Sequence, residues 1–320
     1  MKHFLGIDGG GSKTQFALCD ENGRIIREYT TSGVSYREIG IEKVCELLKD
    51  GTDYMLKGYS NVTGACFGMP CFGENPADDM KAEEQIRKTL APVPLTIIND
   101  VAAAWAGTLA FESGIIILAG TGSMALGRDI HGVIKRTGGW SEFFSDEGSC
   151  YWLGKRTLQL FSKQSDGRLP KNRLYDIVRA HFSLENDIDI VGIVETKIMS
   201  TRRDVAALQI LLYQAAQEGD ESARQMYLSA AREIASMIKA LRAKMDLRPD
   251  SPWSYAGGVF NVKNLILDPL RECLEDLDMC FVRPRLTPVD GAILFAVDAF
   301  DPEAMLNVVN GLKAFRNLEI

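Results

Sequence analysis

The sequence has no hydrophobic stretch long enough to cross a membrane and no sustained run of basic residues. One of its most apolar segments, residues 115–119, is far shorter than the roughly 20 residues that a membrane-spanning helix needs. Lysine and arginine are scattered and the net charge is -7, so the basic surface typical of nucleic-acid-binding proteins is missing. The amino-terminal MKHFLGIDGG reaches glycine and aspartate before a signal-peptide core could form. We therefore expect a cytoplasmic protein that binds neither a membrane nor a nucleic acid.

Histidines and paired cysteines are also scarce. The chain has three histidines and no GxSxG element, which argues against a hydrolase triad. Its seven cysteines are odd in number and scattered, and the closest pair, Cys66 and Cys71, lacks the CxxC spacing of a zinc or redox site. We expect free, buried thiols.

The length of the chain predicts two lobes. Its 320 residues, 46% of them hydrophobic, exceed the ~100–200 residues of a usual domain. We expect a first lobe at 1–112 and a second at 113–320, with the helix at about 289–300 as a candidate to pack back toward the first lobe. Two lobes imply a cleft between them.

A pattern of strand, glycine turn and strand occurs twice. The first copy lies at 4–7, 9–11 and 15–19, and the second at 115–119, 120–122 and 124–127. Aligning Gly23 with Gly132, which close equivalent hairpins, also aligns the two glycine turns. This indicates an internal duplication, and duplicated lobes favour an active site between them.

The rest of the chain alternates strand and helix signals. We expect further strands at 62–67, 94–98 and 253–256, and helices at 41–56, from 101 onward, and at 151–162, 204–217, 221–245 and 289–299. This alternation predicts an α/β fold.

The first glycine turn is a candidate phosphate site. It consists of Asp8, Gly9, Gly10, Gly11, Ser12, Lys13 and Thr14. Glycines let backbone N–H groups approach a phosphate, and Asp8 could hold Mg²⁺ through water. A P-loop is excluded because Ser12 interrupts the Gly-Lys pair and no helix follows; a dinucleotide fingerprint is excluded because Thr14 replaces its third small residue. A plain hairpin turn is the remaining alternative.

The second glycine turn and a later glycine pair complete a candidate nucleotide site. The turn consists of Gly120, Thr121, Gly122 and Ser123, whose amides and hydroxyls could bind the β- and γ-phosphates. The main reason to expect a phosphate site at this turn is that it is the repeat partner of the first turn. Gly257 and Gly258 follow a strand and could offer a flat surface to adenine, although an ordinary turn between a strand and a helix would read the same.

Asp100 is the candidate general base. It stands at the carboxyl end of an apolar strand, where open α/β sheets place ligand-contacting residues. A carboxylate there could accept the proton of a sugar hydroxyl that attacks the γ-phosphate. The alternative is a plain helix N-cap, a position that suits both Asn99 and Asp100.

Residues 138–149 form the densest group of small, aromatic and acidic residues. Such a mixture is typical of a sugar site, where a ring meets an aromatic or glycine wall and carboxylates accept hydroxyl protons. Asp146 and Glu147 could instead be acidic residues that complement the start of a helix.

Six ordered motifs resemble those of the BadF/BadG/BcrA/BcrD ATPase family and, within it, the N-acetylglucosamine kinases of the sugar kinase, Hsp70 and actin superfamily. They are GIDGGGSKT at 6–14, IINDVAAAWAG at 97–107, AGTGSMA at 119–125, GGWSEFFSDEGSCYWLG at 138–154, AGGVF at 256–260 and PVDGAILFA at 288–296. The resemblance implies a two-lobed, actin-like α/β ATPase with duplicated, ribonuclease H-like lobes and its active site in the interlobe cleft. It also implies ATP and Mg²⁺ as cofactors and a homodimer.

The resemblance assigns roles and leaves the sugar open. Asp100 would be the general base, and Asp8 and the glycine turns would bind MgATP. The sugar site would be lined by Ser35, Asp100, Thr121, Gly139, Trp140 and Asp146. Ser35 stands where N-acetylglucosamine kinases carry an Asn, and Ser141 and Ser145 depart from the usual GWG and GDEGS. Glucosamine, N-acetylmuramic acid or another hexosamine could therefore replace N-acetylglucosamine.

Three other functions compete with an amino-sugar kinase. By the resemblance, a second enzyme class of the same family is the activator ATPase of 2-hydroxyacyl-CoA dehydratases, but such activators are usually shorter and carry a sequence more like DxGSTTTK at the first motif. A sugar-sensing regulator would need a helix-turn-helix segment, and we expect the first strand to begin at residue 4. A catalytically silent sugar-binding protein is the third.

Overall fold

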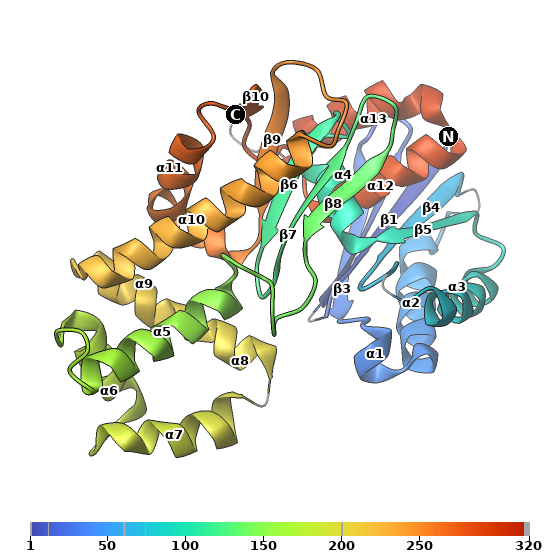
Figure 1. Cartoon of the computed structure of the whole chain (residues 1–320). Helices are drawn as coiled ribbons and strands as arrows, with labels where there is room; N and C mark the ends of the chain where they lie inside the picture. The colour runs from blue at the N-terminus through green and yellow to red at the C-terminus, as the bar shows by residue number, and fades with distance from the viewer. Residues whose placement is uncertain (1, 12, 60–61, 74, 200, 317–320) are drawn as a thin grey trace. The chain divides into compact units, whose positions relative to one another are not determined.

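The computed structural model describes residues 2–11, 13–59, 62–73, 75–199 and 201–316 (Figure 1). The chain divides into two compact units. The first comprises residues 1–113 and 282–320, and the second comprises residues 114–281. Within the described residues, no helix combines the length and apolar character that a membrane span requires.

The first unit is built on a mixed five-stranded sheet. Its strands are β1 (His3–Gly9), β2 (Lys13–Asp20), β3 (Ile25–Ser32), β4 (Gly64–Met69) and β5 (Leu95–Asn99). They lie in the order β3-β2-β1-β4-β5; β2 is antiparallel to both of its neighbours, and β1, β4 and β5 are parallel. The carboxyl ends of β1, β4 and β5 therefore meet at one edge of the sheet.

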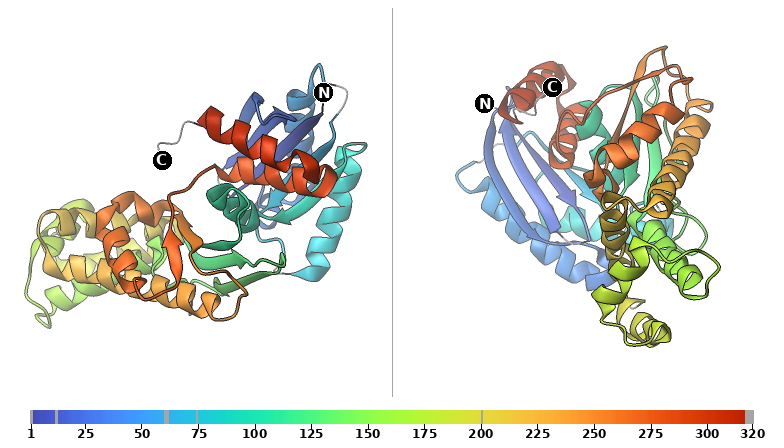
Figure 2. Two further views of the ribbon diagram at one scale, coloured as in Figure 1. Left: turned by 90° about the horizontal axis from the view of Figure 1, so that it is seen from above. Right: turned by 90° about the vertical axis from the view of Figure 1, so that its left-hand side faces the viewer.

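Helices cover both faces of this sheet. They are α1 (Tyr36–Ile39), α2 (Ile41–Leu56), α3 (Pro76–Leu90), α4 (Asp100–Leu109), α12 (Pro288–Phe300), the 3₁₀ turn η4 (Pro302–Ala304) and α13 (Met305–Arg316). Because side chains alternate along β1, Leu5 and Ile7 pack with α2 and α3, whereas Phe4 packs with α4 and α12. Figure 2 shows α2 and α12 on opposite faces of the sheet.

Helix α12 lies unusually close to β1 and α4. A Cβ atom on Gly6 would lie 2.4 Å from the carbonyl oxygen of Val289, and one on Gly291 would lie 1.9 Å from that of Ala103. This packing places residues 282–320 in the first unit, whereas the sequence had grouped 113–320 in one lobe and named the helix at 289–300 as a candidate to pack back.

A buried ion pair joins α13 to α12. Asp290 is fully buried, and its two carboxylate oxygens accept hydrogen bonds of 2.7 and 2.8 Å from the Arg316 guanidinium. Asp290 also closes a capping box with Thr287 at the start of α12. The last described residue is thus held against the core of the first unit.

The second unit repeats the same strand pattern. Its strands are β6 (Gly114–Ala119), β7 (Ser123–Arg128), β8 (Ile134–Gly138), β9 (Ser251–Ala256) and β10 (Met279–Phe281), in the order β10-β9-β6-β7-β8. β7 is antiparallel to both of its neighbours, and β6, β9 and β10 are parallel, as β2 and then β1, β4 and β5 are in the first unit. Gly23 and Gly132 turn the equivalent hairpins with φ of 74° and 81°. The predicted duplication of the two sheets is confirmed.

Between β8 and β9 the second unit carries a large helical insertion. The helical segments of this unit are α5 (Cys150–Ser165), α6 (Arg173–Phe182), η1 (Asp187–Asp189), α7 (Ile190–Ile193), the π-helical η2 (Val194–Ile198), α8 (Arg202–Ala207), α9 (Gln209–Gln217), α10 (Glu221–Arg242), η3 (Gly258–Val262) and α11 (Asn264–Cys273). The helix predicted at 204–217 is in fact two helices, because i to i+3 hydrogen bonds around Leu208 interrupt it. Helix α10 also ends earlier than predicted, at Arg242.

Two glycine substitutions test the close packing of α12. Gly291→Ala should lower the free energy of unfolding by about 2 kcal/mol or more, because the new Cβ would push α12 away from α4. Gly192→Ala is the matched control: Gly192 also lies in a helix, but among the described residues no atom beyond its chain neighbours and its own helix backbone is within 4 Å of its Cβ position, so stability should stay equal or rise slightly. Urea denaturation measures both, and an equal effect of the two variants would contradict this packing.

Candidate functional site

The first glycine turn connects β1 to β2 and is held by a neighbouring loop. The Gly10 amide donates to the Lys13 carbonyl at 3.0 Å, and the Val34 amide donates to the Gly10 carbonyl at 3.0 Å. A Cβ atom on Gly33 would lie 2.1 Å from the carbonyl oxygen of Gly11, so the loop after β3 rests directly on the turn. Ser12, which the sequence assigned to phosphate binding, lies outside the described residues.

Asp8 lies at the base of this turn, near the carboxyl end of β1. It pairs with Gly68 on β4, and it is mostly buried. Burial raises its pKa from 3.8 to about 6, and the nearby Lys13 ammonium opposes that rise. Within the described part of the chain, no hydrogen bond offsets the burial of this carboxylate. A bound cation would do so.

The residues around Asp8 fit a Mg²⁺ ion that is bound together with phosphates. No group of three or more His, Cys, Asp or Glu side chains that could hold a metal by themselves occurs among the described residues. Mg²⁺ at a phosphate site keeps several waters and needs only one or two carboxylates from the protein. Asp8 can supply one of them.

Asp100 begins α4, immediately beyond the carboxyl end of β5. The N-cap of α4 is Asn99, whose side chain accepts from the Val101 amide at 2.9 Å and donates to the Phe72 carbonyl at 2.7 Å. Asp100 Oδ1 lies 3.0 Å from the same amide. The capping role that competed with catalysis is therefore filled by Asn99, and Asp100 occupies the first helical position.

Asp8 and Asp100 belong to the same edge of the sheet. In the strand register, Asp8 pairs with Gly68 and Gly68 pairs with Ile98. The Cα atom of Asp100 lies 3.4 Å from where a Cβ atom of Gly68 would be, so Asp100 adjoins the strand position that pairs with Asp8. Gly68 has no side chain to fill the space between them.

Ser35 lies next to the first glycine turn and precedes α1. It is buried, and its carbonyl accepts from the amides of Glu38 and Ile39. Its hydroxyl makes no capping bond to the helix. The side chain of the next residue, Tyr36, is held by Asp79, which the sequence analysis missed. Asp79 is buried and accepts a hydrogen bond from the Tyr36 hydroxyl at 3.0 Å.

In the second unit, the second glycine turn connects β6 to β7 and packs on the start of α5. The amides of Cys150 and Tyr151 donate to the carbonyls of Gly120 and Thr121 at 2.8 and 3.4 Å. Thr121 is exposed. Ser123 is buried; its hydroxyl donates to the Glu147 carbonyl at 2.6 Å and its amide to Asp146 at 3.2 Å. Ser123 thus supports the turn with both of its donors.

The glycine pair after β9 lies against this turn. Gly257 has a φ of 108°, and a Cβ atom on it would lie 2.4 Å from the carbonyl oxygen of Ala119. Gly257 and Gly258 are both exposed, so their backbone is open to a flat ligand beside the turn. Only glycine permits both the close approach and this conformation.

Asp146 also contacts the second glycine turn. It is 4% exposed, and a Cβ atom on Gly122 would lie within 3.0 Å of both carboxylate oxygens. Arg202, which the sequence analysis missed, donates to Asp146 at 2.6 Å. Nothing in the sequence signals this contact, because 56 residues separate the two partners.

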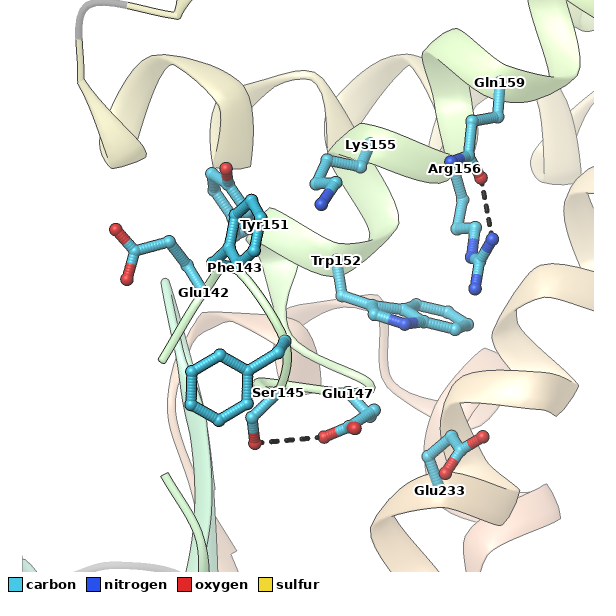
Figure 3. Close-up of a pocket in the computed structure, with 11 residues that line it drawn as sticks. Glu142, Phe143, Ser145, Glu147, Tyr151, Trp152, Lys155, Arg156, Gln159 and Glu233 are labelled. Atoms are coloured by element: carbon cyan, nitrogen blue, oxygen red, sulfur yellow. Dashed lines mark hydrogen bonds between the residues drawn. The ribbon is translucent and has the colours of Figure 1, made fainter. Parts of the chain in front are cut away.

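The aromatic part of residues 138–149 is largely exposed. Gly139 turns the chain with a φ of 67°, and Trp140 is 73% exposed with the Arg136 guanidinium 5.8 Å from its ring centre. Glu142, Phe143, Ser145 and Glu147 line a cavity of about 270 Å³. Figure 3 shows these four residues beside the first turns of α5. Asp146 thus contacts the glycine turn, whereas its neighbours on both sides line this cavity.

The structure brings the predicted residues together as two sets, one in each unit. The first unit holds Asp8, Gly9, Gly10, Gly11, Lys13, Thr14, Ser35 and Asp100 at or near one edge of its sheet. The second unit gathers Gly120, Thr121, Gly122, Ser123, Asp146, Gly257 and Gly258 around one turn, with Gly139 and Trp140 in the adjoining loop. Thr14 is fully buried and donates to the Ser32 carbonyl at 2.9 Å, so it stabilises the hairpin.

Comparison with known proteins gives one family and several relatives. Residues 5–296 match the model of the BadF/BadG/BcrA/BcrD ATPase family. The chain is 27% identical over 281 residues to the N-acetylmuramic acid/N-acetylglucosamine kinase of Clostridium acetobutylicum, covering 86% of this chain and 91% of that protein. It is 26% identical to the N-acetyl-D-glucosamine kinase of Dictyostelium discoideum (92% and 98% covered) and 25% identical to a glucosamine kinase of Vibrio cholerae (92% and 96%).

Solved structures show the same fold. A Chromobacterium violaceum protein described provisionally as an N-acetylglucosamine kinase has a TM-score of 0.72 at 21% identity, covering 92% of this chain and 98% of its own. The ROK hexokinase of Thermus thermophilus has a TM-score of 0.60 at 16% identity, covering 93% and 99%. The predicted fold class, a two-lobed, actin-like α/β ATPase fold with duplicated lobes, is confirmed.

The raised pKa of Asp8 predicts a pH-dependent stability. The folded protein holds this proton more tightly than the unfolded chain, so the contribution of Asp8 to stability falls as the pH rises from 4 to 6. Asp8→Asn should therefore raise the free energy of unfolding of the metal-free protein at pH 8, by on the order of 2 kcal/mol. The gain should shrink toward pH 4.5.

Urea denaturation in EDTA at pH 8 and pH 4.5 measures this effect. Asp50→Asn, at an exposed position in the same unit, is the control and should change stability little at either pH. A loss of stability in Asp8→Asn at pH 8, or a gain that is the same at both pH values, would contradict the burial argument.

Proposed function

Because the chain belongs to the BadF/BadG/BcrA/BcrD ATPase family, we propose that it is an ATP-dependent kinase that phosphorylates a hydroxyl group of an amino sugar. Three relatives that each span more than 85% of the chain are named as kinases of N-acetylglucosamine, N-acetylmuramic acid or glucosamine. These sugars share the glucosamine ring. We therefore propose N-acetylglucosamine or a related hexosamine as the acceptor.

The observation that carries the proposal is the position of Asp100. It stands at the carboxyl end of a parallel strand, at the sheet edge that also carries Asp8, and Asn99 fills the capping role. In phosphoryl transfer, a carboxylate that accepts the proton of the attacking hydroxyl needs such a position close to the phosphate-binding groups. Asp100 is accordingly assigned as the general base.

The other residues bind and orient the substrates. The backbone amides of the glycine turn in each unit are proposed to bind the phosphates of ATP, and Gly257 and Gly258 to face the adenosine. Asp8 would hold Mg²⁺ through water; when bound, this ion neutralises part of the phosphate charge. Ser35, Thr121, Gly139, Trp140 and Asp146 are proposed to contact the sugar. A cytoplasmic location and a homodimer stay predictions.

The Asp100→Asn variant tests the assignment of the base. Its turnover should fall by about 10²- to 10⁴-fold, because the amide cannot accept the hydroxyl proton. The dissociation constant for MgATP should stay within roughly threefold of the wild type, since Asp100 is not assigned to the nucleotide. An ADP-release assay with N-acetylglucosamine, glucosamine and N-acetylmuramic acid measures turnover, and calorimetry measures nucleotide binding.

Asp50→Asn is the matched control for this test. It makes the same chemical change at an exposed position on α2 and should keep wild-type turnover. Turnover of Asp100→Asn within a factor of three of the wild type would remove Asp100 from the mechanism. A parallel loss of nucleotide binding would indicate a structural role instead.

A further inference from the structure

Asp146 places a buried negative charge against the second glycine turn. Its φ of 60° is in the left-handed region, and its side chain is almost completely buried. One carboxylate oxygen accepts from the Ser123 amide at 3.2 Å. Both oxygens lie within 3.0 Å of where a Cβ atom of Gly122 would be.

This charge conflicts with the function proposed for the turn. A turn that binds the phosphates of ATP has to attract anions, whereas a carboxylate at this distance repels them, and burial strengthens the repulsion because little water screens it. A phosphate-binding turn next to Asp146 therefore requires a compensating positive charge.

Arg202 supplies that charge from a distant part of the sequence. It is the first residue of α8, and its Nη2 donates to the second oxygen of Asp146 at 2.6 Å. The same nitrogen lies 3.1 Å from the Cβ position of Gly122, so the guanidinium also adjoins the turn. Its Nε is 3.6 Å from Glu142. The Arg202 side chain is 46% exposed, which leaves part of it accessible to a ligand.

We infer that Arg202 is a positioning residue that orients Asp146 and cancels its charge at the second glycine turn, so that the turn can bind the phosphates of a nucleotide. The inference rests on the proposed function, because it takes this turn to be a phosphate site. It adds a residue that the motifs do not contain, and it explains how a carboxylate assigned to the sugar can adjoin a site for polyphosphate.

The groups around Asp146 determine how this pair responds to pH. Arg202 faces it from α8, Glu142 and Glu147 belong to its own segment, and the turn between β6 and β7 contributes the Ser123 amide. Burial raises the pKa of Asp146, while the Ser123 amide and Arg202 act to lower it. Without Arg202, Asp146 should protonate at a higher pH, and its protonation would remove the repulsion.

Calorimetric titration with MgATP tests the inference at pH 8 and pH 5.5. Arg202→Met should weaken binding at least tenfold at pH 8 and by a smaller factor at pH 5.5, where Asp146 is more protonated. Arg202→Lys, which keeps the positive charge, should stay within about threefold of the wild type. The double variant Asp146→Asn with Arg202→Met should recover most of the lost affinity, because it removes both charges.

Arg173→Met is the matched control. Arg173 is an exposed arginine of the same unit, and it pairs with the carboxylate of Glu218. This variant should bind MgATP like the wild type. Thermal unfolding of each variant shows whether a loss of affinity accompanies a loss of the fold.

The outcomes separate this inference from the proposed function. Arg202→Met that binds MgATP like the wild type at both pH values, or a double variant that recovers no affinity, would overturn the role of Arg202. A wild-type protein that binds MgATP with the expected dependence on Arg202, but phosphorylates no sugar, would support this inference and refute the kinase. Absence of MgATP binding in the wild type would refute both.

Discussion

The candidate site depends on backbone segments that approach each other more closely than a side chain would allow. In the first unit, Gly33 rests on the carbonyl of Gly11; in the second, Gly257 rests on the carbonyl of Ala119. Each contact fixes a glycine turn from a neighbouring loop. Because the turns are held in this way, their remaining amides have defined directions before any ligand arrives, and a rigid phosphate site needs this preorganisation.

Each glycine turn has a carboxylate beside it whose negative charge calls for a positive partner. Asp8 adjoins the first turn, where burial leaves its carboxylate in need of a cation. Asp146 adjoins the second turn, and the Arg202 guanidinium already serves as its cation. A phosphate ligand that brings its own Mg²⁺ would satisfy Asp8, whereas Asp146 is balanced by the protein itself. In the proposed function the two carboxylates would therefore have different tasks, Asp8 toward the metal and Asp146 toward the sugar.

Local patterns in the sequence predicted most strands of the two sheets, although the short edge strand β10 was missed. Both glycine turns and Asp100 follow apolar strands, and the repeated order of strand and turn indicated the duplicated sheets. Contacts between distant segments could not be predicted in this way. Arg202 reaches Asp146 only because the helical insertion folds back, and α12 joins the first unit because Gly6 and Gly291 leave room for it. Helix α3 was missed because only four of its 15 residues are buried.

Identification of the phosphorylated product would test the proposed kinase activity most sharply. The purified protein would be incubated with MgATP and, separately, with N-acetylglucosamine, glucosamine, N-acetylmuramic acid or glucose, and the sugars would be analysed by mass spectrometry alongside ADP. The proposed function predicts one sugar phosphate for each ADP formed, with at least one amino sugar preferred to glucose. ADP formation without a sugar phosphate, or a preference for glucose over every amino sugar, would contradict it.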